Sequence, residues 1–336
     1  MKKRDPNGNV LTRKVIPEQL AMHDLTRPYL PCSPYIDEYA FKSGKPTSEE
    51  HLWGPRDYFK GMFYGTSVCH FASETGYHGC PSPDSLRKFI KPEQLWHWTT
   101  DRSDPKAPIQ EDWLCHAAMM EPDQNGPYSY RDRLMSNQVK TLFGREPQSL
   151  DDYAKASQIS QAEAKKYFIE RFRISKWRRT GIIWWNLIDG WPQISDAIVD
   201  WYGTKKLAYS YIKRSQNPVC MMFDEPELGG TRLPLYAVND SREDARLEYE
   251  VVDLTGSGEA VMKGECLVRS DESVRAADYR IPAGEKRFYL IRWRNADTGE
   301  EGVNHYMSNI IDIDYDEYLG YMKECGFDSA FEGFGE

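Results

Sequence analysis

The longest run of apolar residues with helical periodicity lies between residues 149 and 177. Ala164, Phe168 and Phe172 recur at i, i+4 and i+8, which places them on one face of a helix. Ser149 with Asp152 resembles a capping box, although Asp stands where Glu or Gln is usual. The pattern therefore predicts a long helix with one apolar face. Charged residues are expected to fill the other side of this helix: Lys165, Lys166, Glu170, Arg171 and Arg173.

A nearly continuous apolar run, residues 181–189, follows this helix directly. Such a run is typical of a strand buried on both faces, as in a parallel sheet. Earlier in the chain, short apolar runs at 28–34, 51–53 and 68–74 end in loops that carry Trp, His, Glu or Pro. Strands whose C-terminal ends meet polar and aromatic residues form the active face of a (β/α)8 barrel. We therefore expect barrel-like β/α units over residues 26–215.

Beyond residue 217 the pattern changes to strand-length segments, several of them alternating between apolar and polar positions. These segments are 235–238, 247–254, 260–268, 285–294 and 304–313. Strands at this spacing, separated by Gly- and Asp-rich turns, favour an immunoglobulin-like antiparallel β-sandwich over residues 216–336. The acidic tail after Tyr315 is expected to form a short helix packed on the sandwich, and residues 1–25 form a polar N-terminal segment.

Composition narrows the class of protein. The 336 residues, 40% of them hydrophobic, are enough for two domains. The net charge of −9 and the short basic cluster at 176–179 argue against a nucleic-acid partner. No segment approaches the roughly 18 apolar residues of a membrane span, and no apolar signal-peptide region follows the basic N-terminus. Seven scattered cysteines fit a reducing compartment, which favours the cytoplasm.

Cys69, His70, His78 and Cys80 invite a zinc interpretation. Their spacing does not match the usual zinc-ligand patterns, and strand alternation points Cys69 and His70 to opposite faces. We therefore expect no metal and no cofactor.

Glu74 is the most informative candidate for chemistry. It ends a short apolar strand and is followed by Thr75 and Gly76, which places the carboxylate in a pocket rather than on an open surface. A retaining glycosidase needs a carboxylate that attacks the anomeric carbon, with a second carboxyl group roughly 5–5.5 Å away. From position and flanks alone, the alternative that Glu74 only caps a turn is equally compatible.

The run at 181–192 offers a sugar-binding surface. Trp185, at the end of the predicted buried strand, can stack beneath a pyranose ring, and Asp189 can accept hydrogen bonds from sugar hydroxyls. For Trp184 and Trp191, packing in the core is the favoured alternative.

Together these segments resemble glycoside hydrolase family 2, especially its β-mannosidase-like branch. The family's nucleophile segment reads F-x-S-E-x-G, and here Phe71-Ala-Ser-Glu74-Thr-Gly76 stands in its place. Its last barrel strand reads G-x-x-x-W-Q-x-N-D-x-W-P, and residues 181–192 read GIIWWNLIDGWP. Segments 149–173 and 199–219 and the run Val303-Asn-His-Tyr306 are also similar, so the resemblance covers about residues 25–320.

The resemblance implies that Glu74 is the nucleophile at the end of barrel strand seven, and that Trp185 is the sugar platform of strand eight. His51-Leu-Trp53 looks like the end of strand six, where the family places a residue, often Tyr, that touches the nucleophile. Trp53 cannot donate a phenolic hydrogen bond. Asn186 replaces the usual Gln and Ile188 the usual Asn, which puts the sugar contacts in doubt. The expected substrate-binding residues are His51, Trp53, Trp185, Asn186 and Asp189.

The family's acid/base Glu lies in a W-x-G-N-x-E-like motif on strand four, and no Glu here stands in that context. The resemblance thus implies only strands five to eight, half of a barrel, with open sheet edges that are costly to leave uncovered. An upstream glycosidase half, or self-association, is the expected partner beside a β-linked sugar. Without a general acid, the isolated chain is expected to be incomplete or inactive.

Two hypotheses from different classes follow. The chain is the C-terminal part of a retaining exo-β-glycosidase, β-mannosidase-like first and β-galactosidase or exo-β-glucosaminidase next. Alternatively, it is a non-catalytic carbohydrate-binding or interaction remnant that keeps Trp53 and Trp185 but performs no chemistry.

Overall fold

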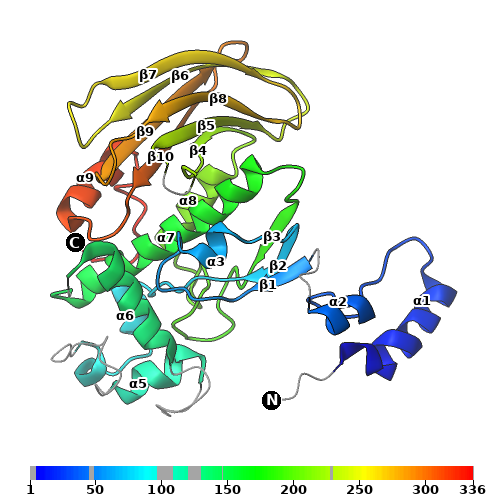
Figure 1. Cartoon of the computed structure of the whole chain (residues 1–336). Helices are drawn as coiled ribbons and strands as arrows, with labels where there is room; N and C mark the ends of the chain where they lie inside the picture. The colour runs from blue at the N-terminus through cyan, green and yellow to red at the C-terminus, as the bar shows by residue number, and fades with distance from the viewer. Residues whose placement is uncertain are drawn as a thin grey trace.

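The computed structural model describes residues 5–44, 49–96, 109–119, 130–145, 147–227 and 230–335. Three regions are visible in Figure 1: an N-terminal arm, a helical body around a small parallel sheet, and two antiparallel sheets. No helix in these ranges has both the length and the apolar character needed to cross a membrane.

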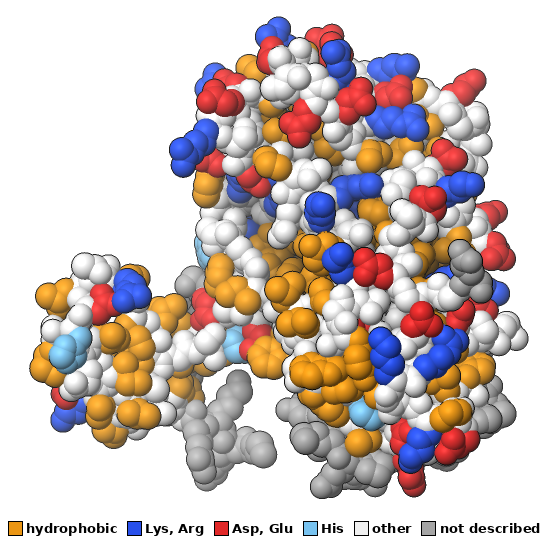
Figure 2. Space-filling model, turned by 180° about the vertical axis from the view of Figure 1, so that it is seen from behind, with side chains coloured by type: hydrophobic (Ala, Val, Ile, Leu, Met, Phe, Trp, Pro, Cys, Tyr) orange, Lys and Arg blue, Asp and Glu red, His pale blue; other side chains and the backbone are white. Residues whose placement is uncertain are grey.

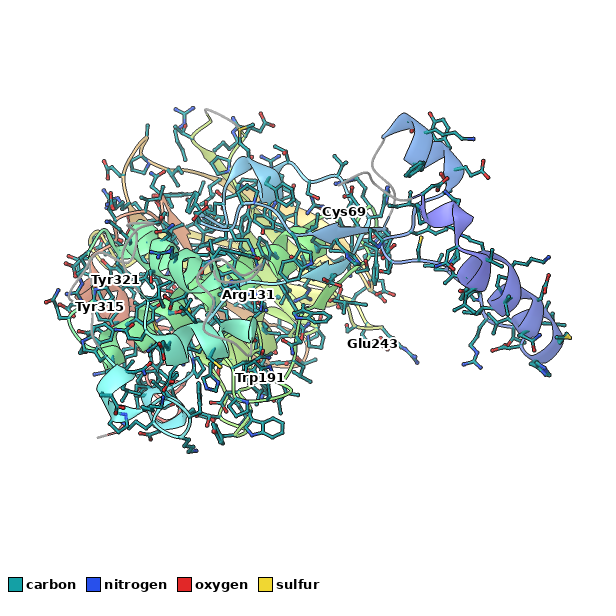
Figure 3. All side chains as sticks on the ribbon, turned by 90° about the horizontal axis from the view of Figure 1, so that it is seen from below. Cys69, Arg131, Trp191, Glu243, Tyr315 and Tyr321 are labelled. Atoms are coloured by element: carbon teal, nitrogen blue, oxygen red, sulfur yellow. The ribbon has the colours of Figure 1, made fainter. Side chains whose placement is uncertain are left out.

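The N-terminal arm, residues 5–44, carries helices α1 (Ile16–His23) and α2 (Glu38–Ser43). It extends away from the body in Figure 1, and seen from below it projects from the side of the molecule where Cys69 lies (Figure 3). The strand expected to end at residues 28–34 is not formed. The three prolines at 28, 31 and 34 provide no N–H groups for a ladder, which explains this failure. Exposed apolar side chains are visible on the arm in Figure 2 and include Val10, Leu11, Met22, Leu25 and Leu30.

The parallel sheet contains β1 (Glu49–Leu52), β2 (Phe71–Thr75) and β3 (Gly181–Trp184), in the order β1-β2-β3. The described residues thus provide three parallel strands rather than the four expected. The prediction that the run from residue 181 is a strand buried on both faces is wrong. Only its first four residues form a strand, that strand lies at the sheet edge, and Ile183 is 54% exposed. An edge strand has no neighbour on one side to cover it.

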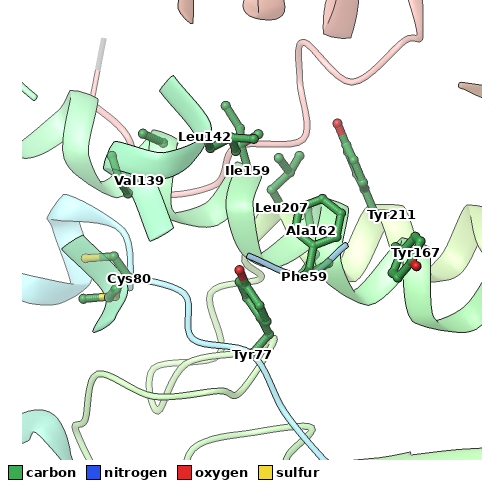
Figure 4. Close-up of a cluster of buried hydrophobic side chains, with 14 of the residues drawn as sticks. Phe59, Tyr77, Cys80, Val139, Leu142, Ile159, Ala162, Tyr167, Leu207 and Tyr211 are labelled. Atoms are coloured by element: carbon green, nitrogen blue, oxygen red, sulfur yellow. The ribbon is translucent and has the colours of Figure 1, made fainter. Parts of the chain in front are cut away.

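Several helices make up the rest of the body (Figure 1). They are α3 (Met62–Gly65), α4 (Pro83–Leu86), α5 (Glu111–Leu114), α6 (Tyr130–Phe143), α7 (Leu150–Ile174) and α8 (Leu207–Ser215). The predicted long helix is confirmed as α7, and the Oγ of Ser149 accepts a hydrogen bond from the N–H of Asp152 at 3.1 Å. Apolar side chains from several elements pack around α7 (Figure 4), among them Phe59, Tyr77 and Leu207.

Several of the charged residues predicted to lie opposite the apolar face of α7 do not face solvent. Lys165, Lys166 and Glu170 are buried. The reason is the position of α7 between the two β regions. On one side Phe168 stacks on Trp184 of β3, with ring centroids 5.8 Å apart. On the other side, α7 meets the antiparallel sheets.

The described residues after 217 form seven antiparallel strands: β4 (Val219–Phe223), β5 (Arg232–Asn239), β6 (Ala245–Asp253), β7 (Ala260–Val268), β8 (Ser273–Arg280), β9 (Arg287–Asn295) and β10 (Glu301–Ser308). They form two sheets, β10-β9-β6-β7 and β4-β5-β8. Both sheets contribute to one apolar core, to which Met222, Leu235, Leu247 and Ile291 belong. Two sheets that enclose a common core are the arrangement of a β-sandwich. The sequence did not single out β4 and β8.

The predicted helix in the tail is confirmed as α9 (Tyr315–Glu324). Its first turn is capped by Asp314, whose carboxylate accepts from the N–H groups of Asp316 and Glu317. Tyr318 of α9 packs edge-on against Phe288 of β9, so the helix covers one end of the sandwich.

A buried polar network joins α7 to β10. Glu163 Oε1 lies 2.7 Å from His305 Nε2 and also accepts a hydrogen bond from the hydroxyl of Tyr318. Further along α7, Glu170 accepts hydrogen bonds from Asn304 Nδ2 at 2.7 Å and from Lys166 Nζ at 2.8 Å. Asn304 and His305, which the sequence offered as part of a motif, therefore dock the sandwich onto α7.

Candidate active site

Glu74 is the second-last residue of β2, and its side chain is 30% exposed. In the sheet register it lies opposite His51 of β1. Because parallel strands end at one edge of a sheet, side chains from the ends of β1 and β2 meet there. The Nε1–H of Trp53 donates to Oε1 of Glu74 at 2.7 Å, and His51 Nδ1 lies 3.7 Å from Oε2. Each carboxylate oxygen thus has one nitrogen partner.

The contact made by Trp53 clarifies a departure from the family pattern. The indole provides no phenolic hydroxyl, but its N–H reaches the same carboxylate. A donor directed at a carboxylate oxygen fixes the orientation of the carboxylate.

The N-terminal arm reaches this site through Ser33. Its Oγ lies 3.0 Å from His51 Nε2 and donates to Glu49 Oε1 at 2.7 Å. The backbone N–H of Tyr35 also donates to the Glu49 carboxylate. Burial opposes ionisation of Glu49, but hydrogen bonds from Ser73, Ser33 and Tyr35 outweigh it and lower its pKa. Glu49 is therefore an ionised group that anchors the arm.

Trp185 follows β3 at the same end of the sheet. Its backbone N–H donates to the carbonyl oxygen of Thr75 at 2.8 Å, so Trp185 lies beside the end of the strand that carries Glu74. Trp185 is 52% exposed, and the neighbouring Leu187 and Ile188 are also exposed. Asn186 turns its side chain inward along the loop and donates from Nδ2 to the carbonyl of Ile188 at 2.9 Å.

Asp189 is only 2% exposed. Its Oδ1 accepts hydrogen bonds from Ser195 Oγ at 2.6 Å and from Gln193 Nε2 at 2.8 Å. Burial raises the pKa of this carboxyl group, against the opposing effect of Lys206. In the structure Asp189 holds the loop after β3 together, and its contact with a sugar hydroxyl stays a prediction.

Sequence reasoning missed a buried polar cluster next to Trp53, formed by Arg56, His78 and Asp196 and called here the Arg56 cluster. Arg56 Nη1 lies 3.5 Å from Asp196 Oδ1, and His78 Nε2 lies 3.5 Å from Oδ2. Burial lowers the pKa of His78 to about 3, so this imidazole is neutral at pH 7. No local pattern could reveal the cluster, because its members come from three segments far apart in the chain.

The sequence favours packing in the core for both Trp184 and Trp191, and the structure places the two residues differently. Trp184 contacts the core, with Phe168 on one side and Lys165 Nζ 4.2 Å from its ring centroid. Burial lowers the pKa of Lys165 to about 7. Trp191 stacks against the ring of His116 at 5.4 Å, away from β3.

The described residues contain no group of three or more His, Cys, Asp or Glu side chains placed to hold a metal ion. Cys69 and Cys80 are both buried. Burial raises the pKa of Cys69, which keeps its thiol protonated.

Comparison with known proteins identifies relatives of one kind. No protein-family model matches the chain. An exo-β-D-glucosaminidase from Arthroderma benhamiae is 26% identical over 219 residues, which are 63% of this chain and 22% of that protein. A β-mannosidase B from Aspergillus terreus is 26% identical over 236 residues, 65% of this chain and 24% of that protein. The chain thus spans about a quarter of the length of these relatives.

Solved structures share the fold. The β-D-mannosidase from Dictyoglomus thermophilum matches with a TM-score of 0.71 at 23% identity, over 91% of this chain and 35% of that one. The exo-chitosanase from Amycolatopsis orientalis matches with a TM-score of 0.56 at 16% identity, over 79% of this chain and 30% of that one. The chain is therefore related to the β-mannosidase and exo-β-glucosaminidase group of glycoside hydrolases, in agreement with its predicted place in glycoside hydrolase family 2.

Proposed function

We propose that the chain is the C-terminal part of a retaining exo-β-glycosidase of the β-mannosidase type, with Glu74 as its nucleophile. The observation that carries this proposal is the convergence of Trp53 Nε1 and His51 Nδ1 on the Glu74 carboxylate, at the strand end beside the half-exposed Trp185. The names of the relatives support a β-linked amino sugar or mannose as the sugar.

The reaction is a double displacement. A carboxylate oxygen of Glu74 attacks the anomeric carbon, the bond to the leaving group breaks, and a glycosyl ester forms that water then hydrolyses. Trp185 supplies an apolar face for the sugar ring, and Trp53 and His51 hold the carboxylate. Asn186 and Asp189 shape the loop beneath the sugar.

The leaving oxygen must be protonated by a general acid from outside this chain. Glu49 lies close in the structure but does not suit this role. It is buried, it accepts hydrogen bonds from Ser33 and Tyr35, and its lowered pKa keeps it ionised.

We further propose that β1, β2 and β3 correspond to strands six to eight of a (β/α)8 barrel, and that the sandwich is immunoglobulin-like. The likeness to the Dictyoglomus enzyme over 91% of the chain supports this correspondence. One edge of β3 pairs with no strand of the described residues, and Ile183 and the adjoining Leu187 are exposed. This edge is then the place for a further parallel strand from an upstream half or a second copy.

A substrate with an activated leaving group tests the nucleophile without a general acid. We expect 2-deoxy-2-fluoro-β-mannosyl fluoride to release fluoride and to leave one 2-fluoromannosyl group on the chain, measured by intact mass spectrometry and mapped to Glu74. Glu74→Gln should abolish the adduct because the amide cannot attack, a loss of at least ~10³-fold in rate. Glu50→Gln, which alters a neighbouring partly buried carboxyl on β1, is the matched control and should label normally.

Labelling that survives Glu74→Gln would assign the nucleophile to another residue. Absence of labelling in the unmodified chain, under conditions that label the Dictyoglomus β-mannosidase, would reject a working nucleophile. Binding of β-manno-oligosaccharides without labelling would then favour the second candidate, a carbohydrate-binding remnant that uses the exposed Trp185.

A further inference from the structure

We propose that Arg56 and Asp196 are positioning residues that fix the indole of Trp53 on the Glu74 carboxylate. This inference rests on the proposed role of Glu74 and adds residues that no sequence motif indicated. It concerns how the hydrogen bond between Trp53 and Glu74 is maintained.

Trp53 needs such support because the sheet does not provide it. It follows Leu52, the last residue of β1, and the chain from 53 to 56 has no regular structure. Its Nε1–H nevertheless reaches Glu74 at 2.7 Å. A loop tryptophan can keep this geometry only if its neighbours hold its ring.

Arg56 holds one face of that ring. Its guanidinium carbon lies 4.9 Å from the centroid of the Trp53 ring, a distance at which cation–π attraction is effective. Arg56 is itself fixed, because Gln138 Nε2 donates to its backbone carbonyl at 2.8 Å and its Nη2 donates to the hydroxyl of Tyr130 at 3.0 Å. A cation on the indole face also draws electron density from the ring and strengthens the N–H as a donor to Glu74.

Asp196 sets the position of Arg56. Its carboxylate is fully buried and lies 3.5 Å from Arg56 Nη1, with neutral His78 at the same distance on the other oxygen. Neither oxygen of Asp196 makes a short hydrogen bond to the described residues. A buried ion pair with few hydrogen bonds is a poor source of stability, which points to a role in the site.

Gly76 shows how closely these groups pack. A Cβ on this residue would lie 2.7 Å from Trp53 Cη2, 2.8 Å from Asp196 Oδ1 and 2.8 Å from the carbonyl oxygen of Trp185. The far edge of the indole and the Asp196 carboxylate therefore both rest on the backbone that follows Glu74. A shift of Asp196 or Arg56 would leave room for Trp53 to rotate away from the carboxylate.

The first test measures the labelling reaction with 2-deoxy-2-fluoro-β-mannosyl fluoride as separate inactivation rate and apparent binding constants. We expect Arg56→Met and Asp196→Asn to lower the rate constant by at least about tenfold, with binding changed less than threefold. Arg56→Lys, which keeps the charge, should recover most of the rate. Arg171→Met is the matched control. It removes a guanidinium of α7 that is paired with Asp224, and it should label like the unmodified chain.

The second test needs no reaction. In the chain labelled with 5-fluorotryptophan, the ¹⁹F resonance of Trp53 is assigned by its loss in Trp53→Phe. We expect this resonance to shift in Glu74→Gln and in Arg56→Met, because both changes disturb the indole hydrogen bond, and to stay in place in Arg171→Met.

The outcomes separate the two proposals. If the unmodified chain is not labelled, the role of Glu74 fails, while the ¹⁹F spectrum still decides whether Arg56 positions Trp53. If Arg56→Met is folded and leaves the Trp53 resonance unmoved, or keeps the labelling rate within twofold, the positioning role is wrong. Should Arg56→Met fail to fold, Asp196→Asn gives the same readouts.

Discussion

The two sides of α7 bury polar groups in different ways. Toward the sandwich, Glu163 and Glu170 are each bonded to two or more side chains, among them His305 and Asn304. Toward the parallel sheet, Lys165 Nζ and the carboxylate of Asp196 make no hydrogen bond to the described residues. The hydrogen-bonded side therefore docks two regions onto each other, whereas the other side keeps polar groups under a site at a cost in stability.

The largest loss of stability is expected for a change at Glu163, on the side of α7 that faces the sandwich. Burial opposes ionisation of Glu163, but His305, Lys166 and the hydrogen bonds it accepts lower its pKa to about 2. Glu163→Ala would leave His305 Nε2 buried without its acceptor and would leave the Tyr318 hydroxyl with only its contact to the Tyr211 hydroxyl. We expect the free energy of unfolding to fall by about 4 kcal/mol in urea titrations. Glu248→Ala, at an exposed pair with Arg294, is the control and should cost less than about 0.5 kcal/mol. Similar losses in the two variants would show that the buried network on the sandwich side contributes no more to stability than an exposed ion pair.

On the side of α7 that faces the parallel sheet, a smaller expected effect is a loss of stability at acid pH. The folded pKa of His78, about 3, lies below its value of 6.5 in the unfolded chain. The unfolded state therefore binds more protons below pH 6.5, and stability is complete above 6.5 and falls as the pH decreases. Between pH 7 and 5 we expect a loss on the order of 2 kcal/mol from His78, measured by denaturant unfolding at each pH.

His305, whose pKa burial also lowers, contributes in the same direction, so His78→Gln should reduce the slope without abolishing it. An unchanged slope in His78→Gln would show that His78 is not the group that titrates.

The smallest effect has the opposite sign. Lys165 is fully buried, its pKa is lowered to about 7 by burial, and its Nζ lacks a hydrogen-bond acceptor in the described part of the chain. Lys165→Met keeps the length of the side chain and its contact with Trp184 while removing the amine. We expect a gain of about 1 kcal/mol at pH 7, reduced by the lost cation–π contact. Thermal unfolding at matched pH measures this gain. A clear loss of stability would show instead that the Lys165 amine stabilises the fold.

Much of the fold could be predicted because it depends on local patterns. The apolar spacing and Ser149 cap of α7, and the alternation within β6 and β7, are written in neighbouring residues. These features need no knowledge of distant partners. The meeting of Trp53 and Glu74 was implied by the resemblance to glycoside hydrolase family 2 and not by a local pattern.

The remaining features depend on distant partners. In the described part of the chain the apolar run at residue 181 pairs only with β2, so it forms an edge strand. Lys166 and Glu170 of α7 are buried by the sandwich, whereas Lys165 is buried against Trp184 of the parallel sheet. Arg56 meets Asp196 across 140 residues of sequence, and neither neighbourhood carries a signal. Such contacts are properties of the assembled chain alone.

Gly76 offers a marker for related sequences. Any larger residue there collides at once with Trp53, Asp196 and the backbone of Trp185. A homologous chain that keeps glutamate two positions earlier but lacks this glycine must have rebuilt the surroundings of its carboxylate. The residue at this position therefore separates relatives that share this packing around the carboxylate from relatives that do not.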